Sequence, residues 1–372
     1  MCSQKKIKVL VVDDSALMRK MIPLIISSDE NIEVIGTAMD GDFALRKIPY
    51  LKPDVITLDI NMPRMDGLTT LKSIVRDFRI PVILVSSLTE EGAEITLRGL
   101  EMGAFDFVSK PKESISIKIS AISHELIDKI KLSTNYKPLK YKEPRQPFKK
   151  SFQQNTALPL KTYTAESIVA IGISTGGPKA LTDILPMLPA DFPSAILIVQ
   201  HMPEGFTDIL SRRLDSICKI RVKEASDGEI LSPGTAFIAP GGRHLMIKRT
   251  NYGIITVLSN SPAVAGHKPS ANVLFSSVAK EYRERSVGII MTGMGNDGVE
   301  GLGRIREFGG ITIAQDEETS VVYGMPKAAI ERGFVDIVLS LDDIAINLLK
   351  ITGSRNFNKE QMKGEIRQEI FH

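Results

Sequence analysis

Short apolar runs and amphipathic segments alternate along most of the chain. Five runs recur at regular spacing within residues 1–125, and each is expected to form a strand: 7–12, 31–38, 54–60, 81–87 and 104–110. Between them lie stretches with helical periodicity, such as 16–28 and 67–78. Strands that alternate with helices in this way predict a doubly wound α/β domain over residues 1–125, with a parallel sheet covered by helices on both faces.

A second series of apolar runs predicts a second α/β domain over residues 164–352. The runs expected to form strands are 167–173, 195–200, 235–240, 254–259, 286–292, 311–315 and 335–340. Helical stretches separate several of these runs, which predicts a mostly parallel sheet. The region 235–259 is expected to contain an antiparallel hairpin.

Residues 126–163, between the two series, are interpreted as the end of a helix followed by a flexible linker. The helix is expected over 114–132, and the segment 133–163 has four prolines, many lysines and no apolar period. Six basic residues against one acid fall within 137–150, which suits a solvated spacer or, alternatively, a docking segment for an acidic partner. The tail 353–372 carries charges of both signs and is expected to be disordered or a loose helix.

Composition narrows the class of protein. Hydrophobic residues make up 43% and charged residues 24% of the 372 residues, as in soluble globular proteins. The net charge of +3 is too small to argue for nucleic-acid binding. No apolar run approaches a membrane span, and no secretory signal is expected, so membrane insertion is not predicted. The two cysteines, Cys2 and Cys218, cannot form a disulfide framework, which favours a cytoplasmic location.

Polar residues stand at several strand ends of the first domain. Asp13 and Asp14 follow the first predicted strand, and Asp59 lies near the end of the third. Because the carboxyl ends of parallel strands share one edge, these carboxylates are expected to converge, and their oxygens suit Mg²⁺. Ser86 and Lys110 end the next two strands, where they can bind a phosphoryl group on Asp59. The alternative is a set of helix-capping aspartates with a surface lysine.

Residues 5–125 resemble a response-regulator receiver domain of the flavodoxin-like type. The motifs that carry this resemblance are VVDDSALMRK (11–20), DINMPRMDGL (59–68), VSS (85–87) and SKP (109–111). The resemblance implies that Asp59 accepts a phosphoryl group from a histidine kinase. It also implies that Ser86 is the switch hydroxyl, that Lys110 is the phosphate partner and that the peptide bond before Pro111 is cis. The implied Mg²⁺ ligands are Asp13, Asp14, Asp59 and the Asn61 carbonyl.

The segment GISTGGPKA (172–180) opens the second domain with a glycine-rich turn between a predicted strand and a predicted helix. It fits the G-x-S-x-G pattern, in which a turn presents a serine, here Ser174, above the sheet. It lacks the lysine of a phosphate-binding P-loop and the spacing of dinucleotide-binding loops. A structural turn without chemistry is the remaining alternative.

A nucleophilic serine needs a base, and the histidines are few. His201 ends the predicted strand 195–200 and so faces the same sheet edge as Ser174, whereas His267 is the alternative base in a loop region. Asp297, in the glycine-rich loop after 286–292, can orient the imidazole, although a helix N-cap is its plainer interpretation. Backbone N–H groups of such loops, for example that of Met294, can stabilise an oxyanion.

Further motifs resemble the catalytic domain of the CheB family of chemotaxis methylesterases: GISTGGP (172–178), QHMP (200–203), APGGRHL (239–245), HKPSANVLF (267–275) and TGMGNDG (292–298). With the receiver and linker, the resemblance covers nearly the whole chain in that family's order. It implies a phosphorylation-regulated serine hydrolase that demethylates glutamate methyl esters of chemoreceptors, releasing methanol, and deamidates receptor glutamines in chemotactic adaptation.

The resemblance also implies roles for single residues. Ser174 is implied to be the nucleophile, His201 the base and Asp297 the acid that orients it. The Met294 amide is implied to be the oxyanion donor, and the Thr175 hydroxyl borders the site. The hydrolase needs no cofactor in this family. The unphosphorylated receiver is expected to restrict access to the catalytic edge, and phosphorylation to relieve the restriction. The family commonly has an acid where this chain has Asn272, which puts the substrate-side contacts of that loop in question.

Three other functions are weighed against this one. A receiver-controlled regulator could bind receptor or kinase without catalysis, and loss of hydrolysis in Ser174→Ala would distinguish the two. A DNA-binding response regulator is disfavoured because the second domain lacks a basic recognition helix. A hydrolase acting on a different ester is the third alternative.

Overall fold

The computed structural model describes residues 5–87, 89–110, 118–136 and 167–353. The chain divides into two compact units, at 144/145. Within the described ranges, every helix is too short or too polar to cross a lipid bilayer. The predicted linker, most of it within 137–166, the predicted tail 354–372 and the bond before Pro111 lie outside the described residues.

The first unit is the predicted doubly wound domain. Its strands are β1 (Ile7–Val12), β2 (Ile32–Ala38), β3 (Val55–Asp59), β4 (Val82–Ser86) and β5 (Asp106–Ser109). They form one sheet in the order β2-β1-β3-β4-β5, and every pair is parallel. All five predicted strands are therefore confirmed within one or two residues at each end.

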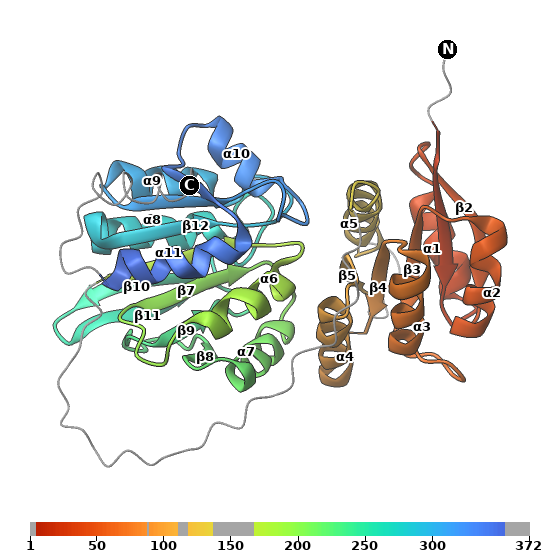
Figure 1. The fold of residues 1–372 in the computed structure, drawn as a ribbon, viewed down its shortest axis with the longest axis horizontal. Helices are drawn as coiled ribbons and strands as arrows, with labels where there is room; N and C mark the ends of the chain where they lie inside the picture. The colour runs from red at the N-terminus through yellow and green to blue at the C-terminus, as the bar shows by residue number, and fades with distance from the viewer. Residues whose placement is uncertain (1–4, 88, 111–117, 137–166, 354–372) are drawn as a thin grey trace. The chain divides into compact units, whose positions relative to one another are not determined.

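Helices cover both faces of this sheet (Figure 1). They are α1 (Met18–Ile26), α2 (Gly41–Leu51), α3 (Gly67–Ser73), α4 (Glu90–Glu101) and α5 (Lys118–Ser133), with a π-helical turn at Ile74–Phe78 after α3. Helix α1 packs against α5, while α3 packs against α2 and α4. Strands β3 and β4 are buried along their full length because they lie inside the sheet and beneath helices on both sides.

The second unit contains a seven-stranded parallel sheet, in the order β14-β13-β12-β6-β7-β9-β8. Its strands are β6 (Ile168–Ile173), β7 (Ala195–Gln200), β8 (Arg221–Glu224), β9 (Thr235–Ile238), β12 (Ser286–Ile290), β13 (Ile311–Gln315) and β14 (Ile337–Leu339). Central strands β6 and β7 are wholly buried and wholly apolar apart from Gln200. The predicted mostly parallel α/β sheet is confirmed.

Helices again lie on both faces of this sheet (Figure 1). They are α6 (Gly177–Ile184), α7 (Phe206–Ile217), α8 (Ala271–Tyr282), α9 (Val299–Glu307), α10 (Met325–Glu331) and α11 (Leu341–Gly353), with short 3₁₀ turns at Leu185–Met187 and Arg283–Arg285. Helices α8, α9 and α10 pack in succession, and α6 packs against α7 and α11. Alternate residues of β6 and β7, such as Ala170 and Leu197, join one buried apolar cluster with Phe275 of α8.

The antiparallel hairpin differs in its bounds from the prediction. It is formed by β10 (His244–Thr250) and β11 (Gly253–Ser259), whereas residues 235–238 form β9 inside the main sheet. Two strands have no counterpart among the predicted runs. Strand β8 has the sequence RVKE at the sheet edge, and β10 ends in KRT, so neither presents a continuous apolar run.

Candidate active site and phosphoacceptor site

Ser174 stands at the carboxyl end of β6, where the chain turns into α6. Its backbone N–H donates to the Thr292 carbonyl (3.0 Å), and the residue is partly exposed. Gly176 opens α6 with a left-handed φ of 80°, which favours glycine. The loop after β12 comes so close that a β-carbon on Gly293 would lie 2.7 Å from the Ser174 β-carbon. This is the strand–turn–helix setting that presents a nucleophile.

His201 follows the neighbouring strand β7. Gln200 pairs with Ile173 in the parallel ladder, so Ser174 and His201 come directly after paired positions. The His201 side chain is 9% exposed, and its Nε2 lies 2.8 Å from Oδ2 of Asp297. Its other ring nitrogen, Nδ1, is buried and has no hydrogen-bond partner among the described residues. One edge of the imidazole is therefore held, and the other is available for a proton.

Asp297 is fully buried and accepts hydrogen bonds from several directions. Besides His201, the Ser270 hydroxyl donates to Oδ1 (2.7 Å), and the backbone N–H groups of Ala271 and Asn272 donate to Oδ2 (2.6 Å) and Oδ1 (3.3 Å). These N–H groups open α8, where the helix end favours an anion. Burial disfavours the charge, but the bonds from His201, Ser270 and Ala271 outweigh it and lower the pKa of Asp297. Asp297 is therefore a carboxylate acceptor, so His201 Nε2 donates.

His267 lies beside His201 but takes a different place in the site. The two imidazole rings are stacked, with centroids 4.0 Å apart and planes 8° apart. Asp297 bonds His201 and makes no hydrogen bond with His267 within the described chain. Burial first, and the charge of His201 second, lower the pKa of His267. The carboxylate thus selects His201 as the oriented imidazole.

Gln200 is a site residue that the sequence analysis did not single out. Its side chain is almost fully buried, and Nε2 donates to the carbonyl oxygens of Ser174 (3.0 Å) and His201 (3.2 Å). A single polar residue that ends an otherwise apolar, buried strand was the available signal. This amide ties the backbones of the two candidate residues together.

The other candidates of this edge are placed as follows. Met294 is exposed in the loop next to Ser174, and Thr175 is buried, its carbonyl accepting from the Thr292 hydroxyl (2.9 Å). Asn272 Oδ1 accepts from the backbone N–H of Gly301 (2.8 Å) and so links α8 to α9. That side chain is engaged inside the domain.

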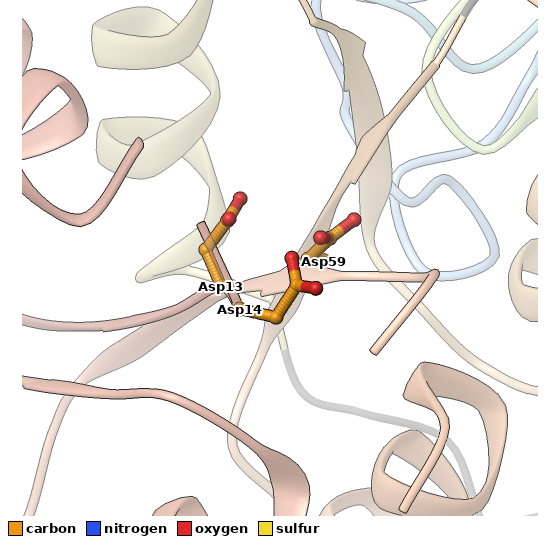
Figure 2. A group of neighbouring side chains, drawn as sticks. All are labelled: Asp13, Asp14 and Asp59. Atoms are coloured by element: carbon orange, nitrogen blue, oxygen red, sulfur yellow. The ribbon is translucent and has the colours of Figure 1, made fainter. Parts of the chain in front are cut away.

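The first unit brings its three acidic residues together at the carboxyl edge of its sheet. Figure 2 shows Asp13, Asp14 and Asp59 pointing into one small region, and each offers a carboxylate oxygen within 4.8 Å of the others. Asp13 and Asp59 are buried, while Asp14 is exposed. Lys110 Nζ lies 2.7 Å from Asp59 Oδ2 and 3.2 Å from Asp13 Oδ2. Oxygen donors in this number suit Mg²⁺.

Burial governs the ionisation of this acidic group. It raises the pKa of both Asp13 and Asp59, and Lys110 only partly offsets the effect. Lys110 is itself desolvated, but its bonds to Asp59 and Asp13 outweigh this and raise its pKa. Lys110 thus only partly balances these desolvated carboxylates, and such a site favours binding of a cation.

Ser86 and Asn61 lie at the same edge but make different contacts. The Asn61 backbone N–H donates to Asp59 Oδ1 (3.3 Å). The buried Ser86 hydroxyl accepts from Thr96 (2.6 Å) and donates toward the carbonyl of Gly92 (3.2 Å) in α4. Ser86 is thus bonded to helix α4 in this structure, on the strand next to Asp59.

Both units match known families. A family model described as response regulator receiver domain matches residues 9–120, and one described as CheB methylesterase matches residues 169–348. Among curated proteins, the chain is 50% identical over 353 residues to protein-glutamate methylesterase/protein-glutamine glutaminase 2 of Koribacter versatilis, covering 93% of this chain and 96% of that protein.

Relatives from other organisms match over similar lengths. The protein-glutamate methylesterase/protein-glutamine glutaminase of Caldanaerobacter subterraneus subsp. tengcongensis is 45% identical over 93% of this chain and 97% of its own length. That of Halalkalibacterium halodurans is 47% identical over 93% of this chain and 99% of its own length. The similarity therefore spans both units.

Proposed function

Because the chain belongs to the CheB family of methylesterases that carry a receiver domain, we propose that Ser174, His201 and Asp297 perform its hydrolysis. The chain is a receiver-regulated protein-glutamate methylesterase and protein-glutamine glutaminase of chemotaxis. The alternatives without catalysis and with DNA binding are thereby set aside. The contact between His201 and Asp297, at the strand end next to Ser174, is the observation that carries the assignment of the triad.

The proposed first half-reaction begins at the free nitrogen of His201. Nδ1 accepts the proton of Ser174 Oγ as the oxygen attacks the carbonyl carbon of a glutamyl methyl ester. Meanwhile the Nε2–H of His201 remains hydrogen-bonded to Asp297. The tetrahedral intermediate carries a negative oxygen, for which the Met294 N–H is the proposed donor, with Thr175 bordering it. His201 then returns the proton to the leaving group, which departs as methanol from an ester or as ammonia from an amide.

The second half-reaction restores the enzyme. Water gives a proton to His201 Nδ1 and attacks the acyl carbon, and the resulting intermediate expels Ser174 Oγ, which takes the proton back. The product is a free glutamate side chain in both cases. Asp297 stays ionised throughout and stabilises the imidazolium, a role that its lowered pKa supports.

In the receiver we propose Asp59 as the phosphoryl acceptor. Asp13, Asp14, Asp59 and the Asn61 carbonyl would hold Mg²⁺, which when bound neutralises phosphoryl oxygens. Lys110 bonds Asp59 and is proposed to pair with the added phosphoryl group. Ser86 is the proposed switch: its hydroxyl leaves Thr96 and Gly92 to bind that group, which alters the contact with α4.

The partners and location follow from the same proposal. A chemotaxis histidine kinase supplies the phosphoryl group, and methylated cytoplasmic segments of chemoreceptors are the substrates, which places the protein in the cytoplasm. The unphosphorylated receiver is proposed to restrict substrate access to Ser174. Residues 1–125 and 164–352 are the proposed limits of the two domains.

The test is methanol release from a methylated chemoreceptor, with and without a small phosphodonor and Mg²⁺. We expect release that rises with the phosphodonor and disappears in Ser174→Ala. Ser216→Ala is the matched control, because the Ser216 hydroxyl donates to the Arg213 carbonyl near the far end of α7. Full activity in Ser174→Ala would refute the proposed nucleophile.

A further inference from the structure

The ring of His267 contacts the face of the catalytic imidazole and leaves its edges untouched. The centroid distance of 4.0 Å and the near-parallel planes put the two rings in direct contact. His201 uses one edge nitrogen for Asp297 and keeps the other for the nucleophile. His267 therefore competes for neither nitrogen, and any effect that it has on His201 acts through the ring face.

The fold fixes His267 in this position. Val264 and His267 exchange backbone hydrogen bonds (3.0 and 2.9 Å) across a tight turn, in which Gly266 has a φ of 82°. The same loop is held from the hairpin, because the buried ring of His244 donates from Nε2 to the carbonyl of Pro262 (3.0 Å). These hydrogen bonds hold the turn, and with it the ring of His267 against the ring of His201.

Burial first, and the charge of His201 second, keep the ring of His267 neutral near neutral pH by lowering its pKa. Its titratable neighbours across the contact are His201 and Asp297, and Lys268 follows it in the loop with Nζ donating to the Asn260 carbonyl (2.9 Å). Burial and His201 lower the pKa of His267, and Asp297 opposes them without reversing the shift. A second positive charge stacked on a protonated His201 would be repelled.

Resting on the proposed triad, we propose that His267 is a positioning residue that stabilises the imidazolium form of His201 during hydrolysis through its neutral ring face. A cation within about 6 Å of an aromatic face is attracted by the π-electrons. In the proposed reaction, His201 becomes an imidazolium when it takes the proton of Ser174. The stabilisation therefore arises on the way to the tetrahedral intermediate and not in the substrate complex, so it raises kcat and leaves KM unchanged.

Two substitutions in the full-length, phosphodonor-activated protein distinguish the effect of the aromatic ring at position 267 from the effect of its protonation. His267→Ala removes the face, and we expect kcat to fall about tenfold with KM changed less than about twofold. His267→Phe keeps a flat ring that cannot be protonated, and we expect kcat within about twofold of the wild type at pH 8. As pH falls through the lowered pKa of His267, the wild-type rate should fall more steeply with acidity than the His267→Phe rate.

The controls distinguish failure of this inference from failure of the triad. Thermal unfolding is measured for each variant, and His267→Phe with its pH profile tests the inference even where His267→Ala does not fold. Unchanged kcat in a folded His267→Ala would overturn the role of His267, as would a rise in KM alone, or His267→Phe as slow as His267→Ala at pH 8. Retained hydrolysis in Ser174→Ala would instead overturn the triad.

Discussion

Ser270 donates its hydroxyl hydrogen to Asp297, with Oγ 2.7 Å from Oδ1. This carboxylate oxygen is the one that His201 does not use, since the imidazole bonds Oδ2. Ser270 immediately precedes α8, and its own backbone N–H donates to Nδ1 of the buried His244 (3.2 Å). Asp297, the proposed orienting acid, is therefore supported by the start of α8 and, through Ser270, by the β10–β11 hairpin.

Replacing this serine should weaken the orientation of the base. We expect Ser270→Ala to lower kcat about tenfold, since a hydrogen bond to a charged group contributes about 1.5–3 kcal/mol. Steady-state methanol release gives the rate. Ser276→Ala on the same helix is the matched control, because the Ser276 hydroxyl donates back to the Asn272 carbonyl within α8 (2.6 Å). Equal kcat in the two variants would argue against support of Asp297 by Ser270.

Asp297→Asn should affect catalysis and the acid stability of the catalytic domain together. We expect kcat to fall about 10³-fold or more, because an amide cannot stabilise the imidazolium or keep its tautomer. The lowered pKa of Asp297 means that its bonds stabilise the folded state above the ordinary carboxyl pKa, and that this stability is lost as pH falls through the lowered value. Denaturant unfolding from pH 2 to 6 should thus show a shallower acid decline in the variant. A decline as steep as in the wild type would contradict this assignment.

Gln200→Glu should slow hydrolysis without preventing folding. The substitution preserves shape but, when ionised, places a carboxylate against the carbonyl oxygens of Ser174 and His201, where an N–H donor now lies. We expect kcat to fall about tenfold or more at pH 8 and to recover relative to the wild type at lower pH, where the protonated acid can donate. Gln200→Met, which cannot donate at any pH, is the matched control. A pH-independent deficit in Gln200→Glu would argue against the donor role.

Asp59→Asn should remove the response to the phosphodonor and stabilise the receiver. Basal methanol release should stay, and stimulation by the phosphodonor with Mg²⁺ should disappear. Burial raises the pKa of Asp59, so the folded receiver binds this proton more tightly than the unfolded chain and loses stability as pH rises through the raised value. At pH 7 the neutral amide avoids this loss.

Calorimetry at pH 7 tests the second effect, with Asp42→Asn as control because Asp42 is an exposed aspartate paired with Arg46 on α2. We expect a higher Tm of the receiver transition in Asp59→Asn and little change in the control. A Tm equal to or below that of the wild type would contradict the burial argument, while retained stimulation would refute Asp59 as the acceptor.

Most of the architecture could be predicted from the chain because buried parallel strands are continuous apolar runs with clear ends. The exceptions have local causes. Strand β8 is short and charged at the sheet edge, and β10 mixes apolar residues with KRT, so the periodic pattern is weak in both. The hairpin was placed in the correct region, but the run 235–240 belongs to the main sheet because β9 pairs with β7.

Side-chain partners could not be predicted in the same way. The sequence offered both His201 and His267 as bases, and only the folded chain shows which of them bonds Asp297, 96 residues from His201 along the chain. Ser86 was placed at the correct strand end, but its hydroxyl is bonded to α4. Such choices depend on rotamers and on segments that are distant in the chain.

Local patterns in the chain were sufficient to identify the residues that end the strands, and therefore the side chains that gather at one edge of each parallel sheet: the three acids in one domain, and Ser174 with His201 in the other. A repeating pattern of buried residues is sufficient for this, because strand direction fixes the edge. Three features are visible only in the folded chain: Nε2 of His201 is bonded to Asp297, His267 covers the face of the His201 ring, and Gln200 joins the two strand ends. Those contacts arise from packing between distant segments, which no local pattern encodes.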